Sequence, residues 1–217
     1  IFSSSCTVYG QADSLPIKES APIKKAESPY GNTKQIGEEI IMDTCKVVPH
    51  LNAIALRYFN PIGAHESAKI GELPIGAPQN LVPYITQTGI GKREKLSVFG
   101  GDYPTVDGTC IRDYIHVVDL AKAHVMALKR LIDGLNKDNF EVFNIGTGKG
   151  SSVLEVIRSF EEVSGQKLNY KVVERREGDV ISAYADTNKA NNVLSWEAKF
   201  DLKDALLSAW KWESSCM

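Results

Sequence analysis

Cysteine and histidine are scarce in this 217-residue sequence, and neither type is clustered. His116 and His124 lie eight positions apart and could share a helix face, but no third ligand is near them. The four cysteines form no C-x-x-C pair, so neither a zinc site nor a disulfide framework is indicated: they are Cys6, Cys45, Cys110 and Cys216. We therefore expect no metal site. Scattered free thiols also indicate a reducing compartment, and we expect a cytoplasmic protein.

Long apolar runs and an excess of either charge are missing as well. No run approaches the roughly 20 residues that cross a membrane, and the N-terminus has no signal-peptide pattern. The net charge of −2 does not favour nucleic acid or an anionic membrane as a partner. Hydrophobic residues make up 43% of the chain and charged residues 24%, as in ordinary soluble globular proteins.

The sequence also lacks an initiator methionine and a dinucleotide-binding fingerprint. Ile1 and Phe2 resemble the end of a buried strand, so we expect that a preceding segment is missing. The stretch from Gly146 to Gly150 follows an apolar run, but its spacing is G-x-G-x-G and no acidic residue follows about twenty positions later at a strand end. We expect a tight turn there that opens a helix at Ser151.

The segments that are present alternate between strand and helix patterns. Helix 28–47 has serine as its cap and proline at its first position, and 117–131 has apolar residues at helical spacing. Expected strands are 1–2, 52–59, 96–99, 113–116, 140–145 and 170–173; further expected helices are 81–90, 151–163, 188–194 and 201–212. This alternation predicts an α/β fold with a largely parallel sheet.

Polar clusters follow three of the expected strands, at 3–7, 58–60 and 144–150. Parallel sheets bind ligands at the carboxyl ends of their strands, so these clusters predict a ligand site.

Tyr30 and Lys34 share one helix face because they are four residues apart. A nearby cation favours the phenolate form of a tyrosine, whose pKa is ordinarily about 10. The spacing therefore predicts that Lys34 lowers the pKa of Tyr30 and prepares it as a general base, with a serine of the 3–5 run holding the same substrate oxygen. The alternative is an ordinary exposed helix surface.

Six motifs, in order, cover nearly the whole chain: FSSSCTVYG, SPYGNTK, LRYFNPIGAH, GTCIRDYIHVVDLA, FNIGTGKGSSV and RREGD. With them the sequence resembles the UDP-glucose (UDP-galactose) 4-epimerases of the extended short-chain dehydrogenase/reductase superfamily. The resemblance implies the C-terminal part of a doubly wound Rossmann-type parallel sheet plus a smaller α/β substrate domain. The expected Rossmann part is 1–60 with 114–146, and the expected nucleotide-sugar domain is 61–113 with 147–217. The family's glycine-rich NAD turn has no counterpart here.

The resemblance also implies a reaction and its residues. NAD would take a hydride from sugar C4 and return it to the other face of a 4-keto sugar. Tyr30 would be the base, Lys34 would lower the pKa of Tyr30 and hold the nicotinamide ribose, and Ser5 would form a hydrogen bond with the 4-oxygen. Tyr58 and Phe59 would complete the cofactor contacts, although Phe59 could equally be core.

A UDP-hexose would contact a larger set of positions. Arg112 and Arg176 would grip the diphosphate, and Asp179 the uridine ribose. Backbone amides at the helix start after Gln79 would meet the diphosphate. The expected substrate contacts are Ser5, Cys6, Thr7, Tyr58, Phe59, Asn60, Gln79, Asn80, Leu81, Ser97, Val98, Phe99, Arg112, Arg176, Glu177, Gly178, Asp179 and Ala183. Tyr114 fits either the site or the core.

A few positions depart from the family pattern. Gln79 replaces an asparagine, Cys6 an alanine, and Cys110 a glycine, which could strain a turn if that position needs positive φ. Ala183 is small, which leaves room for an N-acetyl group and predicts tolerance of UDP-N-acetylglucosamine.

Three alternatives stay open to different degrees. A 4,6-dehydratase would need an acid/base pair where this chain has Ser5 and Cys6. A UDP-pentose 4-epimerase would differ mainly in its pocket lining. A truncated, non-catalytic chain could bind UDP-sugar only, because 217 residues without the glycine-rich part should bind NAD poorly. Family members are often dimers, which implies a homodimer.

Overall fold

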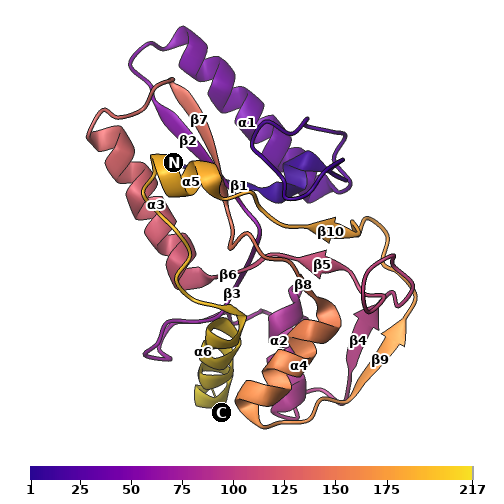
Figure 1. The fold of residues 1–217 in the computed structure, drawn as a ribbon. Helices are drawn as coiled ribbons and strands as arrows, with labels where there is room; N and C mark the ends of the chain where they lie inside the picture. Colours follow the sequence, from indigo (N-terminus) through magenta and orange to yellow (C-terminus); the bar gives the residue numbers. More distant parts are fainter. Residues whose placement is uncertain (217) are drawn as a thin grey trace.

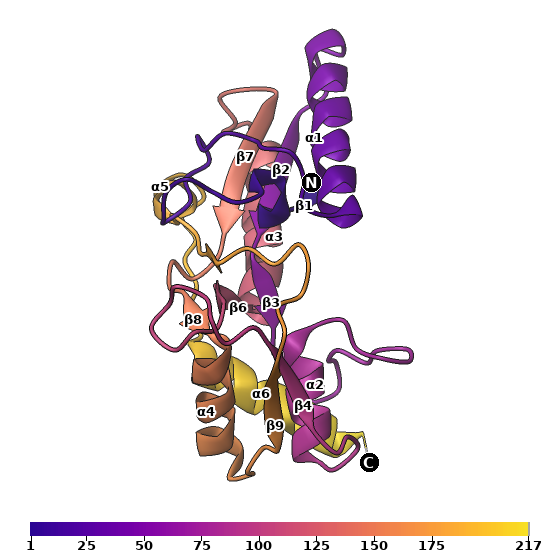
Figure 2. The ribbon, with the colours of Figure 1, turned by 90° about the vertical axis from the view of Figure 1, so that its right-hand side faces the viewer.

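A parallel sheet forms one half of the molecule in the computed structural model, which describes residues 1–216. Its strands are β1 (Phe2–Ser5), β2 (Ala53–Tyr58) and β7 (Phe140–Ile145), in the order β1-β2-β7. Ser5 pairs with Tyr58, and Tyr58 with Ile145, so the three strands end at one edge. Figures 1 and 2 show this half at the top of the molecule.

Helices cover both faces of this sheet, because successive side chains of β2 point alternately to one face and the other. Ile54 and Leu56 are buried against apolar residues of α3 (Val117–Ile132). Arg57 points to the opposite face, where it bonds Glu38 of α1 (Pro29–Val47). Helix α1 begins as its sequence indicates, since the Ser28 hydroxyl accepts from the Gly31 amide and proline follows the cap.

Short strands lie between the two halves. β3 (Asn60–Ile62) pairs with β6 (Tyr114–His116), and β5 (Ile111–Arg112) lies between β10 (Ser182–Ala183) and β8 (Ser151–Ser152). The chain thus continues from β2 into β3 without a long linker, because only Phe59 separates the two strands. Figure 1 shows these short strands at the middle of the molecule.

The other half contains three helices beside a two-stranded parallel sheet. The helices are α2 (Leu81–Gly89), α4 (Val153–Ser164) and α6 (Leu202–Ser215); the strands are β4 (Leu96–Phe99) and β9 (Tyr170–Val173). Ile85, Ile157, Phe160 and Leu206 are fully buried in its core. Figure 2 shows α4 and α6 beside β9, with α2 on the side of β4.

Most expected elements are confirmed, and the differences have local causes. The strand predicted at 1–2 extends through Ser5 because β2 pairs with every residue of it, and a 3₁₀ turn (Cys6–Tyr9) follows. The two-residue strands β5, β8 and β10 are too short to leave a period in the sequence. Gly146 to Gly150 forms a turn with Gly148 at φ +77°, and Ser152 then caps α4.

Helix α5 (Asn188–Val193) lies with the parallel sheet, although the predicted division assigns 147–217 to the other domain. Ala190, Leu194 and Trp196 share a buried cluster with residues of β2 and β7. The Trp196 indole also donates to the carbonyl of Asp119 on α3, at 3.0 Å. An indole buried with its N–H bonded holds this late segment on the sheet.

Candidate active site

The carboxyl ends of β1 and β2 and the first turn of α1 place the predicted catalytic residues together. Ser5 ends β1, is 6% exposed, and accepts a hydrogen bond from the Thr7 amide at 3.3 Å. Tyr30 lies in the first turn of α1 and is 53% exposed. Burial raises the pKa of Tyr30 and the Ser5 hydroxyl lowers it in part, as expected of two neighbouring hydroxyls.

Lys34 lies one turn along α1, with its ammonium 5.3 Å from the centroid of the Tyr30 ring. The same ammonium donates to the carbonyl oxygen of Ser3 at 2.8 Å and lies 5.4 Å from the Phe2 ring. Lys34 and Tyr30 therefore share one helix face, as their spacing predicted, and the Lys34 ammonium also connects α1 to β1 through the Ser3 carbonyl.

The expected lowering of the Tyr30 pKa is wrong for this chain. Partial burial raises the pKa of Tyr30 above 10.0, and the bond to Ser5 offsets only part of that rise. Lys34 faces the ring and the Ser3 carbonyl, so its charge contributes little at the hydroxyl. A Tyr30 phenolate in this site therefore needs further positive charge near its oxygen.

Cys6 and Thr7 follow Ser5 and differ in what they offer a ligand. Burial raises the pKa of the Cys6 thiol to about 12, so it stays protonated at neutral pH. The Thr7 hydroxyl is buried and has no hydrogen-bond partner among residues 1–216. A buried orphan hydroxyl is costly, which makes Thr7 the better candidate for a polar contact.

Tyr58 and Phe59 divide between site and core. Tyr58 is half-buried at the end of β2, with its ring 5.9 Å from that of His124. Phe59 is 4% exposed and belongs to a buried cluster that also contains Tyr9, Ile17 and Ala183. The Phe59 side chain is therefore core, and only its backbone can face a ligand.

A cavity of about 130 Å³ opens beyond the sheet edge. It is bordered by the start of β3, the start of α2, β4 and β5, which are separate in sequence. Predicted substrate residues provide most of its lining: Asn60, Gln79, Leu81, Ser97, Val98, Phe99, Arg112, Arg176 and Asp179. Four further lining residues were not predicted, because apolar or small side chains of this kind are typical of a core: Tyr84, Leu96, Cys110 and Val153. Tyr114, which fitted either the site or the core, also lines the cavity.

Three charged side chains define the polar wall of this cavity. Arg176 donates to both carboxylate oxygens of Asp179, at 2.8 and 3.2 Å, and Arg112 lies 3.5 Å from the same carboxylate. The Arg112 and Asp179 side chains are 14% and 12% exposed. Two guanidinium groups that share one carboxylate leave donors for an anion such as a diphosphate.

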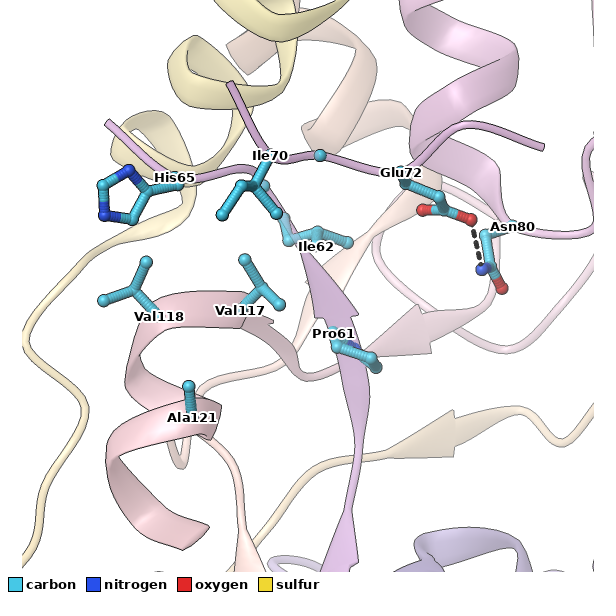
Figure 3. A pocket seen from close by; sticks show the side chains of 11 residues that line it. Pro61, Ile62, His65, Ile70, Glu72, Asn80, Val117, Val118 and Ala121 are labelled. Carbon is cyan, nitrogen blue, oxygen red and sulfur yellow. Dashed lines mark hydrogen bonds between the residues drawn. The ribbon is translucent and has the colours of Figure 1, made fainter. Parts of the chain in front are cut away.

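The start of α2 adds backbone donors to this wall. Asn80 occupies its N-cap position, but its side chain makes no capping bond. It donates instead to Glu72, at 2.8 Å, across the rim of a second, mostly apolar cavity of about 480 Å³ (Figure 3). The first amides of α2 are therefore not occupied by the Asn80 side chain and suit an anion.

The remaining predicted substrate residues lie nearby but line neither cavity. Glu177 and Gly178 form the turn between Arg176 and Asp179, with Gly178 at φ +81°. Ala183 is 7% exposed. Cys110 does not have positive φ, so the exchange from the family's glycine brings no backbone strain.

Within residues 1–216 no group of three or more His, Cys, Asp or Glu side chains could hold a metal ion. No helix in the described part of the chain is both long and apolar enough to cross a membrane.

A parallel sheet with helices on both faces and with a serine, a tyrosine and a lysine at its strand ends, next to an arginine-lined cavity, defines a Rossmann-type α/β protein with a ligand site at the carboxyl ends of its strands. The sequence model of the GDP-mannose 4,6 dehydratase family matches residues 1–208. The chain belongs to that family.

Relatives within the family are UDP-glucose 4-epimerases. The one from Drosophila melanogaster is 48% identical over 99% of this chain and 61% of its own length. The one from Bacillus subtilis (strain 168) is 49% identical over 99% of this chain and 62% of its own length. The human one is 49% identical over 98% of this chain and 60% of its own length. The chain thus spans about three fifths of the length of these relatives.

Solved structures agree with the sequence relatives. UDP-glucose 4-epimerase from Bifidobacterium longum, in complex with NAD+ and UDP, has a TM-score of 0.93 and 45% identity, over 99% of this chain and 63% of that one. The enzyme from Stenotrophomonas maltophila, with bound NAD and formylated UDP-arabinopyranose, has a TM-score of 0.94 and 46% identity over the same shares.

Proposed function

We propose that the protein is an NAD-dependent UDP-glucose 4-epimerase that interconverts UDP-galactose and UDP-glucose. One observation carries the proposal: the Ser5–Tyr30–Lys34 group and the arginine-lined cavity lie at the same sheet edge, connected by Asn60 directly after β2 and Phe59. A substrate that reaches both must combine an anionic group with a group whose proton can be removed.

The diphosphate and uridine belong in the cavity. Arg112, Arg176 and the first amides of α2 would bind the diphosphate, because guanidinium groups and helix N-termini both favour phosphate oxygens. Asp179 would then exchange part of its arginine contact for the ribose hydroxyls. Ser97, Val98 and Phe99 of β4 form the wall available to the uracil.

The residues at the strand ends fit NAD. The buried Thr7 hydroxyl has no hydrogen-bond partner within residues 1–216, and about half of Tyr30 is exposed, so the tyrosine is open to a bound molecule and the threonine has a polar group still to satisfy. When bound, NAD would supply a reversible acceptor for the hydrogen on sugar C4. The residues that would hold it are Ser5, Tyr30, Lys34, Tyr58 and the backbone of Phe59.

Tyr30 would act as the base. Its oxygen would accept the proton of the sugar 4-hydroxyl, and Ser5 would donate a hydrogen bond to the same oxygen as the 4-keto sugar forms. After the keto sugar has turned, the hydride would return to the other face of C4 while Tyr30 returns the proton to the 4-oxygen, which gives a hydroxyl of opposite configuration. Burial raises the pKa of Tyr30, so this proton transfer is the step that most needs further positive charge near the tyrosine oxygen.

Two features bear on the choice of sugar. Ala183 has a small side chain and pairs with Arg112 of the cavity wall, and its size supports acceptance of UDP-N-acetylglucosamine and UDP-N-acetylgalactosamine. The solved relative with formylated UDP-arabinopyranose supports UDP-pentoses as the alternative substrates. The dehydratase reaction for which the family is named is not proposed, because Cys6 with a pKa of about 12 cannot replace an acid at that position.

The test uses the full-length gene product with NAD and UDP-galactose, and follows the formation of UDP-glucose. Tyr30→Phe should lower turnover by about 10²–10⁴-fold, since the proton acceptor is lost. Tyr170→Phe is the matched control, because Tyr170 is also exposed, does not line the cavity and lies on β9, in the other half of the molecule from Ser5 and Lys34. Wild-type turnover by Tyr30→Phe would refute the base. UDP binding without any turnover by the wild type would favour a non-catalytic UDP-sugar-binding protein.

The assembly and location are also proposals. We infer a homodimer from the family resemblance, supported by the exposed apolar residues Ile36, Ile40 and Val47 on α1. Light scattering of the full-length protein would measure its mass. The four free thiols support a cytoplasmic location, which fractionation would test.

A further inference from the structure

Asp113 is a fully buried carboxylate that the proposed chemistry does not use. One of its oxygens accepts from the amide and the hydroxyl of Thr147, at 2.8 and 2.6 Å. The other accepts from the amides of Gly148 and Ala185, at 3.0 and 3.1 Å. A buried carboxylate that satisfies four donors is held in one orientation.

The backbone of Asp113 makes two further connections. Its amide donates to Ala183 at 3.0 Å, and its carbonyl accepts from Asn60 at 2.9 Å. Asp113 therefore bonds to the chain just after β2, just after β7 and around β10. At each of these places the chain passes between the parallel sheet and the half with the cavity.

The space around the carboxylate allows little movement. A Cβ atom added at Gly146 would lie 2.4 Å from an oxygen of Asp113 and 2.9 Å from the Ala185 side chain. Both chain neighbours of Asp113, Arg112 and Tyr114, line the cavity. Any shift of Asp113 thus moves the cavity wall relative to the sheet edge.

We propose that Asp113 is a positioning residue, which fixes the nucleotide cavity at the distance and orientation from Ser5 and Tyr30 that the reaction requires. The inference rests on the proposed function for its catalytic consequence. Displacing reacting groups by about 1 Å can cost 10²-fold in rate, so a joint that fixes two half-sites controls turnover more than nucleotide affinity.

The first test separates affinity from turnover in the full-length protein. Asp113→Asn puts an NH₂ group against N–H donors, and Asp138→Asn is the control on an exposed loop. We expect the Kd for UDP to change less than about threefold while kcat falls roughly 10–100-fold. Equal losses in UDP affinity and kcat, or an unchanged kcat, would overturn the proposal.

Two milder variants at Thr147 test the proposal even if the Asp113→Asn protein does not fold. Thr147→Val removes the hydroxyl, which donates to Asp113 and accepts from the Lys149 amide, and leaves the three amide donors to Asp113; Thr147→Ser keeps the hydroxyl. We expect Thr147→Val to lower kcat several-fold at constant UDP affinity, and Thr147→Ser to restore it. Equal kcat values in Thr147→Val, Thr147→Ser and the wild type would also overturn the proposal.

A distance measurement decides the positioning claim whatever the enzyme does. Spin labels at Lys46 on α1 and Lys171 on β9 report on the two halves, with Cys216 replaced by serine. We expect one narrow distance distribution in the background protein and a broader or shifted one with Thr147→Val or Asp113→Asn. Identical distributions would refute the inference, whereas absent epimerase activity with a broadened distribution would refute only the proposed function.

Discussion

The buried ion pair beneath the Tyr30 helix offers the sharpest test of how the fold supports the site. Glu38 lies two turns beyond Tyr30 on α1, and its carboxylate accepts from the Arg57 side chain twice, once at 2.8 Å, and from the Ser4 hydroxyl. The Arg57 and Glu38 side chains are only 7% and 10% exposed. Arg57 also donates to the Tyr9 hydroxyl, which itself donates to Asn144.

Glu38→Gln should destabilise the protein strongly. The glutamine removes the counter-charge and turns an NH₂ group towards a donor, so a buried guanidinium is left without its partner. Breaking one side of a buried pair costs about 3–5 kcal/mol. For a chain of this size each kcal/mol lowers Tm by roughly 2–4 °C, so we expect a fall of about 6–20 °C.

Differential scanning calorimetry measures this directly. Glu39→Gln is the matched control, because Glu39 is the adjacent, exposed residue and should leave Tm within about 2 °C. The double variant Glu38→Leu/Arg57→Met should recover much of the loss, since no unpaired charge remains. A Glu38→Gln protein that melts with the wild type would show that the pair does not hold α1 on the sheet.

Other consequences can be measured separately. Burial lowers the pKa of His116 below 6.5, so the unfolded chain binds the proton more tightly than the folded one. The stability should therefore fall as pH drops through about 6.5. His116→Asn keeps an acceptor for the Val118 amide and should flatten this dependence of Tm on pH. At pH 8 Cys6 and Cys110, with raised pKa, and buried Cys45 should react slowly with a thiol reagent, leaving Cys216 as the single fast thiol; two or more fast thiols would contradict this. Arg176→Lys should weaken UDP binding by roughly 10–100-fold in calorimetry, since a charged bond contributes about 1.5–3 kcal/mol, whereas Arg175→Lys, which alters an exposed contact to Asp102, should not; equal effects would refute the assignment.

Elements with a strong local signal could be predicted from the sequence. Ser28-Pro29 fixed the start of α1, and the apolar spacing in 117–131 predicted α3 within a residue or two. The strands β5, β8 and β10 could not be found this way, because each pairs over two residues and depends on partners far along the chain. Helix α5 was predicted in its place in the sequence, but its packing against β7 depends on Trp196.

The candidate site was likewise predicted where its residues lie in local motifs and not where they depend on tertiary structure. Residues in ordered motifs, such as Arg112, Arg176 and Asp179, were predicted and line one cavity. The direction of the Tyr30 pKa was missed, since burial and the engagement of Lys34 by a carbonyl depend on tertiary structure. The role of Asp113 could not be predicted from the sequence, because its hydrogen-bond partners lie 34 and 72 positions away along the chain.

Under the proposed function, C4 of a UDP-hexose is inverted within this site by removing and returning the same hydrogen. This inversion is tested most directly by incubating the full-length protein and NAD with UDP-galactose carrying deuterium at C4, in ordinary water, and locating the label by NMR. We expect UDP-glucose with the deuterium kept at C4. Product in which C4 carries hydrogen from the solvent would contradict this expectation.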